Sequence, residues 1–192
     1  MQNVTIRMAS VNDAPALAAI YSYYVINSPA TFEVTTPSAH EFAARIEQTL
    51  QFYPYLVCEV NGQIAGYAYS GRHMARSAYQ WNAELSLYLH KDFTGKGLGP
   101  LLFDKLIQLS VLQGLHNLYG LVTSPNPASE KLHARFGFTK AGTWQKTGFK
   151  NGQWLDVILF EKRIANAVNN PLPPLAIQNI DPAAVASVLS SR

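Results

Sequence analysis

The chain has 192 residues, of which 48% are hydrophobic and 14% charged, and its formal net charge is +3. This length fits one domain of roughly 100–150 residues with a short appendage and excludes a second large domain. The 15 basic residues are scattered without a basic run, which argues against nucleic-acid binding, and the low charge content indicates a surface partly covered by a ligand or a partner.

The amino-terminal third is predicted to form one strand and two helices. The segment before the first strand has no leader pattern and no long apolar run is present, so we expect a cytoplasmic protein that does not contact membranes. A strand is expected over 4–8, a helix over 14–26 and a second helix over 38–52. The second helix has a capping box formed by Ser38 and Glu41.

A hairpin follows, with strands over 55–60 and 63–70 joined by Asn61-Gly62, because both positions of such a turn need positive φ. The single cysteine, Cys58, lies in the first of these strands on its apolar face. We expect it to be buried and not a nucleophile. One cysteine excludes an internal disulfide and a cysteine-based zinc cluster, and we expect no metal site.

The middle of the chain alternates strands and helices. After a loop over 71–77, we expect a strand over 79–89, a helix over 100–113, a strand over 118–122, a helix from 125 to 136 with Gly137 as its C-cap, and a hairpin over 139–150 and 153–163. This order predicts a single mixed α/β domain over residues 1–163. Residues 164–192 form a Pro- and Ala-rich tail, either docked or frayed, with one short helix over 182–189.

A glycine-rich loop, Thr94-Gly95-Lys96-Gly97-Leu98-Gly99, joins a strand to a helix. Such a loop lets the backbone approach a ligand, and the helix behind it offers free N–H groups that suit a pyrophosphate. The spacing excludes a P-loop, which needs Lys followed by Ser or Thr, and the third glycine comes one residue too early for a dinucleotide fingerprint.

The strand before that loop has one apolar face and one face that carries Asn82, Glu84, Ser86 and Tyr88. A solvated polar face is the simpler explanation. However, the strand leads into a crossover helix and therefore lies inside the sheet, where ligands collect beyond the carboxyl ends of strands. We therefore favour a functional role for Glu84.

Three segments together resemble motifs A and B of the GNAT acetyltransferase superfamily: Glu84 to Leu89, Gly95 to Gly99, and Asn126 to Phe138. Further segments are similar to the phosphinothricin and methionine sulfoximine N-acetyltransferase branch: Ala30 to Glu33, Gly66 to Tyr69, Ala78 to Trp81, and Gly148 to Asp156. The resemblance covers about residues 5–163. It implies the GNAT fold, a largely antiparallel sheet with one splayed parallel strand pair and flanking helices.

The resemblance also implies acetyl-CoA as donor and the free amine of a small molecule as acceptor, by direct transfer. Glu84 matches the general base, and His133 stands where many relatives have a tyrosine that acts on the leaving thiolate; packing is its alternative role. The residues matched to cofactor binding are Leu87, Tyr88, Leu89, Gly95, Lys96, Gly97, Leu98, Gly99, Pro100, Asn126 and Ser129. For Asn126, a plain helix N-terminal role is the alternative.

The acceptor pocket implied by the resemblance involves Phe32, Glu33, Arg72, Met74, Arg76, Tyr79, Ser86 and Lys150. Two positions depart from the branch: Thr94 replaces the usual Arg or Gln of the loop, and Met74 replaces a basic residue that grips the acceptor. Arg72 or Arg76 can replace that residue, because a guanidinium binds a carboxylate in a bidentate way. Ordinary core packing is the alternative for the aromatic residues.

The function expected from all this is N-acetylation of the α-amine of a small amino acid or analogue that resembles phosphinothricin or methionine sulfoximine. Acetylation of a protein N-terminus or a polyamine, and a non-catalytic acyl-CoA-binding module, stay open as alternatives. The resemblance and the low surface charge also favour a homodimer.

Overall fold

A seven-stranded sheet forms the centre of the computed structural model, which describes residues 3–191. Its strand order is β1-β2-β3-β4-β5-β7-β6, and β4 and β5 are its parallel neighbours. The strands are β1 (Val4–Met8), β2 (Tyr55–Val60), β3 (Gln63–Arg72), β4 (Asn82–Leu89), β5 (Asn117–Ser124), β6 (Thr139–Lys150) and β7 (Gln153–Arg163). This mixed topology, with β4 and β5 as a parallel pair, agrees with the sheet that the family resemblance implies.

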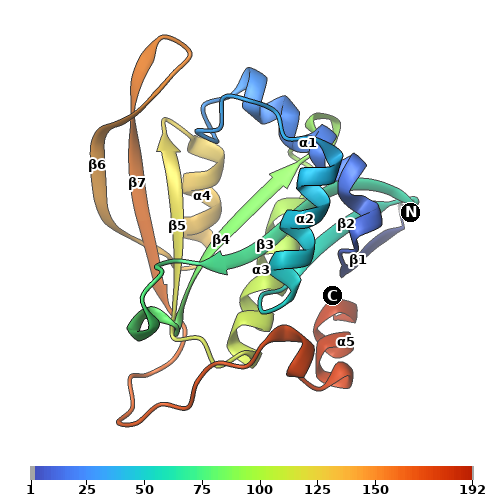
Figure 1. The fold of residues 1–192 in the computed structure, drawn as a ribbon, viewed down its shortest axis with the longest axis vertical. Helices are drawn as coiled ribbons and strands as arrows, with labels where there is room; N and C mark the ends of the chain where they lie inside the picture. Colours follow the sequence, from blue (N-terminus) through green and yellow to red (C-terminus); the bar gives the residue numbers. More distant parts are fainter. Residues whose placement is uncertain (1–2, 192) are drawn as a thin grey trace.

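Helices cover both faces of the sheet (Figure 1). They are α1 (Ala14–Asn27), α2 (Ala39–Leu50), α3 (Leu98–Leu112), α4 (Pro127–Arg135) and α5 (Pro182–Ser190). Helices α1 and α2 pack on one face around Leu17, Phe42 and Ile46, and α3 packs on the other around Leu102 and Leu106. None of the helices in residues 3–191 combines the length and apolar composition needed to cross a membrane.

Apolar side chains of β2 point to both faces of the sheet, which explains why helices cover both faces. Leu56, Cys58 and Val60 belong to the core under α3, whereas Tyr55 and Val57 belong to the core under α1 and α2. Because side chains alternate between the two faces of a strand, an apolar run of this kind is stable only between two helical layers. The free thiol of Cys58 is fully buried, as expected, and burial raises its pKa to about 11.

Strands β4 and β5 pair only at their beginnings and then diverge. Their register holds for Asn82 with Asn117, Ala83 with Leu118, and Glu84 with Tyr119. Beyond these pairs β4 stays bonded to β3 as far as Leu89, while β5 stays bonded to β7. The sheet therefore splits after Glu84, and Figure 1 shows β4 and β5 diverging from there on.

Several predicted boundaries differ from the structure by one to three residues; the helix expected from residue 125, for example, begins at Pro127. Two of the differences adjoin the strand and the loop singled out in the sequence. The strand expected from Tyr79 begins at Asn82, because Ser77–Tyr79 form a 3₁₀ turn in which the Tyr79 N–H bonds the carbonyl of Arg76. The helix expected from Pro100 begins at Leu98, so the last glycine of the loop lies in its first turn. Both differences arise where local turn chemistry competes with the longer element.

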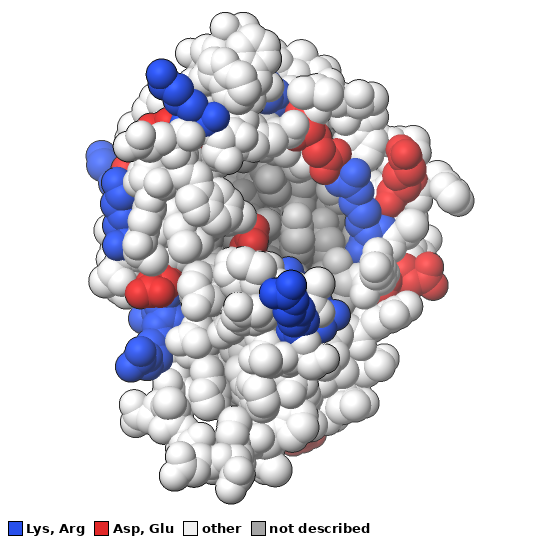
Figure 2. Space-filling view, turned by 60° about the vertical axis from the view of Figure 1, so that its left-hand side comes forward, with Lys and Arg blue, Asp and Glu red and all other residues white. Residues whose placement is uncertain are grey.

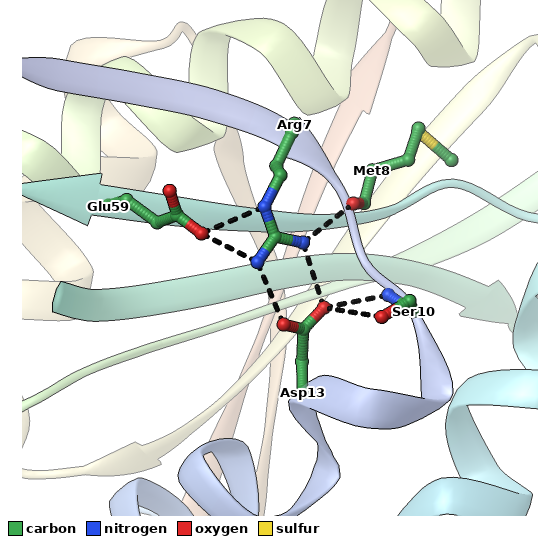
Figure 3. A network of polar contacts seen from close by, with 5 residues as sticks. All are labelled: Arg7, Met8, Ser10, Asp13 and Glu59. Carbon is green, nitrogen blue, oxygen red and sulfur yellow. Dashed lines mark hydrogen bonds and ion pairs between the residues drawn. The ribbon is translucent and has the colours of Figure 1, made fainter. Parts of the chain in front are cut away.

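An ion-pair network fixes β1 to β2 and to the start of α1 (Figure 3). The Arg7 guanidinium donates to both carboxylate oxygens of Asp13, each at 2.8 Å, and to Oε1 of Glu59. Asp13 also accepts from the Ser10 N–H at 2.7 Å. These contacts hold the pKa of the Asp13 carboxyl below its usual range.

The segment after β7 lies along the body and ends in α5, which contacts α3 and β1. Ile177 and Ile180 are buried in the core under α3. The Ile177 N–H bonds the carbonyl of Phe52 at 2.8 Å, and the buried Lys105 Nζ donates to the Ser191 carbonyl. Apolar burial and these hydrogen bonds both hold the segment against the body.

Candidate active site

A cavity of about 510 Å³ lies where β4 and β5 diverge. Its walls come from β4 (Glu84 to Leu89), β5 (Leu121 to Thr123), the glycine loop with the start of α3 (Thr94, Gly95, Gly97, Gly99, Pro100) and α4 with its N-cap (Asn126, Ala128, Ser129, Leu132, His133). Figure 2 shows a hollow on the face that carries the β6–β7 hairpin, with mostly uncharged walls. The cavity has the size of a small-molecule site.

The split leaves one backbone edge of β4 without a strand partner. On its other edge β4 pairs with β3 through Leu89, but β5 has left after Glu84. Backbone N–H groups of Leu87 and its neighbours on the free edge can therefore bond an extended ligand, in the way that a peptide adds to a sheet edge.

The glycine loop closes the same cavity at the start of α3. Gly95 and Gly97 have φ values of 73° and 80°, which a residue with a Cβ adopts only under strain. The first N–H groups of α3 have no intrahelical partner and carry partial positive charge, so this corner suits an anionic group. Lys96 does not line the cavity, and its Nζ lies 4.9 Å from the centre of the Phe93 ring. Leu98, also expected to bind cofactor, is buried in the core.

Glu84 lies where the two strands separate and contributes to the cavity wall. Its neighbours in register are Gly71 on β3 and Tyr119 on β5. Burial raises the pKa of the Glu84 carboxyl, and a hydrogen bond with His73 opposes that rise. A half-buried carboxylate with a raised pKa suits proton abstraction near neutral pH.

His73 is a residue that the sequence analysis missed. Its Nδ1 lies 3.5 Å from Oε2 of Glu84, and its ring stacks on Tyr119 with centres 4.1 Å apart. The sequence places His73 in a loop, without an indication of its partner. The antiparallel register of β3 with β4 supplies that indication, because it sets Gly71 opposite Glu84.

His133 is buried at the edge of the cavity among aromatic rings. Its Nδ1 lies 2.8 Å from the carbonyl of Ser129, and its ring stacks on Phe160. Its Nε2 has no hydrogen-bond partner in the described residues and faces the Cα of Gly120 on β5. The carbonyl can only accept, so Nδ1 carries the proton of the neutral ring. Burial lowers the pKa of His133, and this geometry favours packing over proton donation to a thiolate.

Asn126 and Ser129 also lie at the start of α4. The Asn126 side-chain oxygen accepts the Ser129 N–H at 3.2 Å, so Asn126 is the N-cap of α4, which was its alternative role. Both residues also line the cavity, and the capping contact fixes where the Asn126 amide lies.

Three residues expected in the acceptor pocket connect the loop after α1 to its surroundings. The Glu33 carboxylate accepts from Arg45 at 2.7 and 3.0 Å and from the Tyr21 hydroxyl at 2.9 Å. Burial would raise the pKa of Glu33, but these donors hold it below its usual range. The buried Lys150 Nζ donates to the Thr31 carbonyl at 2.7 Å, and burial lowers the pKa of Lys150. The Phe32 ring packs against Gly148 on β6, where a Cβ would clash with it.

The remaining acceptor candidates, apart from Ser86, lie at the end of β3 and on the segment between β3 and β4. Arg72, Met74, Arg76 and Tyr79 are exposed and do not line the cavity. The Arg72 Nε donates to the Met74 carbonyl at 3.0 Å. Ser86 follows Glu84 along the cavity wall. Within residues 3–191 no three His, Cys, Asp or Glu side chains gather as a metal site would require.

Comparisons with known proteins agree with this arrangement. The family model of the acetyltransferase (GNAT) domain matches residues 6–159. A phosphinothricin N-acetyltransferase of Alcaligenes faecalis is 38% identical over 88% of this chain and 86% of its own length. An L-methionine sulfoximine/L-methionine sulfone acetyltransferase of Salmonella typhimurium is 33% identical over 84% of this chain and 95% of its own length.

A solved structure is similar over nearly the whole chain. It is a GNAT superfamily phosphinothricin acetyltransferase from Sinorhizobium meliloti, determined in complex with acetyl-CoA. Its TM-score is 0.83 at 31% identity, and the match covers 93% of this chain and 96% of that one.

Proposed function

The chain belongs to the GNAT acetyltransferase family, and from this premise we propose that it acetylates the α-amine of a small amino acid or analogue, with acetyl-CoA as donor. The observation that carries the proposal is the split of β4 from β5. It opens a cavity of about 510 Å³ directly beside a carboxylate with a raised pKa. Donor site and base are therefore adjacent.

The cavity fits the donor in shape and chemistry. The free edge of β4 suits the amide groups of a pantetheine arm, and the loop around Gly95 and Gly97 with the start of α3 suits a pyrophosphate. The apolar walls suit the rest of the arm. Acetyl-CoA supplies the acetyl group as a reactive thioester, and N–H groups near Leu87 are placed to polarise its carbonyl.

Glu84 provides the base that the reaction needs. An amino-acid amine is largely protonated at neutral pH, and an ammonium group has no lone pair with which to attack. We propose that Glu84 accepts this proton, directly or through one water, so that the amine can attack without a covalent enzyme intermediate. Its position where the strands separate brings it close to the free edge of β4.

The acceptor class is proposed from the segment that adjoins Glu84 and from the relatives. The segment after β3 brings His73 to Glu84, and three residues further on it carries the exposed cation Arg76. A guanidinium group on this segment suits an acceptor with a carboxylate or phosphinate. Two relatives are named for acceptors of this kind, phosphinothricin and methionine sulfoximine.

A thiol-release assay across amines tests the proposal. The panel contains phosphinothricin, methionine sulfoximine, methionine sulfone, several amino acids, a polyamine and a peptide with a free N-terminus. We expect the first three to have the highest kcat/KM, and Arg76→Gln to raise their KM while the KM for acetyl-CoA stays constant. Preference for the polyamine or the peptide would contradict the acceptor class, and no thiol release with any amine would contradict the reaction.

We also propose that the protein assembles as a homodimer. Large apolar side chains are exposed on the β6–β7 hairpin, where Phe149 and Trp154 pack with ring centres 5.4 Å apart and are 59% and 61% exposed. Aromatic residues are enriched at protein interfaces. Sedimentation velocity at micromolar concentration should give the mass of two chains, and a single-chain mass would contradict this.

A further inference from the structure

We propose that His73 is a positioning residue for Glu84: it donates its Nδ1–H to one carboxylate oxygen and thereby holds the other toward the acceptor amine. This inference rests on the proposed function, since it assigns a partner to the base of that reaction. No motif of the sequence analysis includes His73.

The contacts of His73 place it between Glu84 and the adjoining strand. Nδ1 lies 3.5 Å from Oε2 of Glu84, and the ring stacks nearly parallel on Tyr119, at an angle of 11°. The His73 side chain is 9% exposed and that of Glu84 is 29% exposed. Stacking holds the imidazole in one orientation, so the position of its donor is fixed before substrate arrives.

The register of the sheet explains how a loop residue reaches this place. Gly71 pairs with Glu84 on one side, and Tyr119 pairs with it on the other. His73 follows Gly71 by two residues and turns back over the pair. One oxygen of Glu84 then faces His73, and Oε1 accepts no hydrogen bond from any described residue. That free oxygen is the one available for an amine or a water.

The groups that face this pair determine how it responds to pH. His73 faces Glu84 on β4 and Tyr119 on β5, and Tyr119 lies near Glu161 and Arg163 of β7. Tyr69 on β3 pairs with Ser86 in register and lies near Glu84. Burial raises the pKa of both tyrosines, so they stay neutral at working pH. A donor to Glu84 stabilises the carboxylate, and its removal should raise the pKa of Glu84 further.

Two variants separate the hydrogen bond from the packing. His73→Phe keeps an aromatic ring on Tyr119 and removes the donor, whereas His73→Asn keeps an N–H near the position of Nδ1 and removes the ring. We expect His73→Phe to move the acidic limb of kcat/KM upward by about 0.5–1 pH unit and to lower the plateau roughly three- to tenfold. His73→Asn should restore the limb to the wild-type position.

A merely structural role would give a different pattern. It would lower kcat/KM at every pH and leave the acidic limb of the pH profile where it is in the wild type. His73→Phe, which keeps the ring, would then lower kcat/KM less than His73→Asn. In the Glu84→Gln background, His73→Phe should cause no further loss, because the two side chains act together. Additive losses, or an unmoved limb in His73→Phe, would overturn the inference.

A second readout does not depend on activity. Carbon-13 NMR of labelled glutamate carboxyls, with Glu84→Gln to assign the signal, gives the pKa of Glu84 directly in each variant. A rise in His73→Phe with recovery in His73→Asn supports the inference even if no amine is acetylated, in which case only the proposed function fails. Activity together with an unchanged Glu84 titration would overturn the inference and leave the proposed function intact.

Discussion

At the scale of single residues, Glu84 combines three properties that a base for an amine requires. It is half-buried, it adjoins the cavity, and its pKa is raised by burial. Ser86 and Tyr88 on the same face of β4 also line the cavity but carry no group that accepts a proton readily at neutral pH.

Glu84→Gln should lower kcat at least tenfold near neutral pH, because an amide cannot accept the proton. Binding of acetyl-CoA should change little, since the substitution leaves the β4 backbone and the glycine loop in place. Thiol release and titration calorimetry measure the two quantities. A variant with normal turnover would remove Glu84 from its role.

The pH profile of the wild-type protein follows from the same group. Glu84 acts as a base only when ionised, so kcat/KM should fall as pH decreases through its folded-state pKa. Burial raises that pKa above the ordinary glutamate value, so the fall should begin at a higher pH than for an exposed glutamate. Glu84→Gln should lack this limb, and a variant that retains it would assign the limb to another group.

Gly97→Val tests the glycine loop, with Gly62→Val as a matched control. Both glycines have φ near 80° and open space where a Cβ would lie, so each substitution should cost about 1–3 kcal/mol of folding free energy. Of the two, only Gly97 lines the cavity. Gly97→Val should therefore abolish acetyl-CoA binding in calorimetry while Gly62→Val leaves it intact; equal affinities would refute the loop as a binding site.

The sequence alone indicates as candidates those residues whose neighbours lie close along the chain. Glu84 and the loop glycines stand out because alternation and turn chemistry are local signals. The hydrogen bonds of His73, Glu33 and Lys150 join residues that lie on neighbouring strands or on segments far apart in the sequence. Such contacts leave no periodic pattern in the sequence, so the sequence did not indicate them.

At the scale of elements, the tail is held by burial of a few apolar side chains. Ile177→Ala should lower the free energy of unfolding by about 2–4 kcal/mol, because Ile177 is buried in the core under α3. Leu172→Ala is the control, since Leu172 is 86% exposed, and should change stability by less than about 0.5 kcal/mol. Urea denaturation measures both; equal effects would mean that the tail is not docked in solution.

The Arg7 network that joins β1, β2 and the start of α1 should make stability depend on pH. Arg7 lowers the pKa of Asp13 in the folded state, so the contribution is present above the unfolded value of about 3.9 and is lost as pH falls through the folded value. Asp13→Asn should be less stable at neutral pH and lose less on acidification. Urea midpoints from about pH 6 to 2.5 test this, with the exposed Glu47→Gln as control; parallel curves for Asp13→Asn and wild type would contradict it.

Most elements were predictable because their signals are strong and short-range. Both Asn-Gly turns occur where expected, with positive φ at Asn61 and Asn151, and Gly137 has the positive φ of a helix C-cap. The separation of β4 from β5 could be predicted only from the family resemblance. Strand order and the point of divergence depend on packing between layers, which alternation in a single strand does not specify.

At the scale of the whole molecule, two helical layers enclose a sheet in which β4 and β5 pair over three residues only and then separate. Helices α1 and α2 cover one face and α3 covers the other, so the opening between β4 and β5 is supported on both sides. Its walls come from separate parts of the chain, with Glu84 at the point of divergence. The opening is thus a property of the fold as a whole.

A crystal structure with coenzyme A and methionine sulfone tests this account most directly. We predict extended density along the free edge of β4, phosphates at Gly95 and Gly97, and the acceptor amine within about 3–3.5 Å, or one water, of Glu84. Coenzyme A bound elsewhere, or an amine held away from Glu84 with this cavity filled by side chains, would contradict the account.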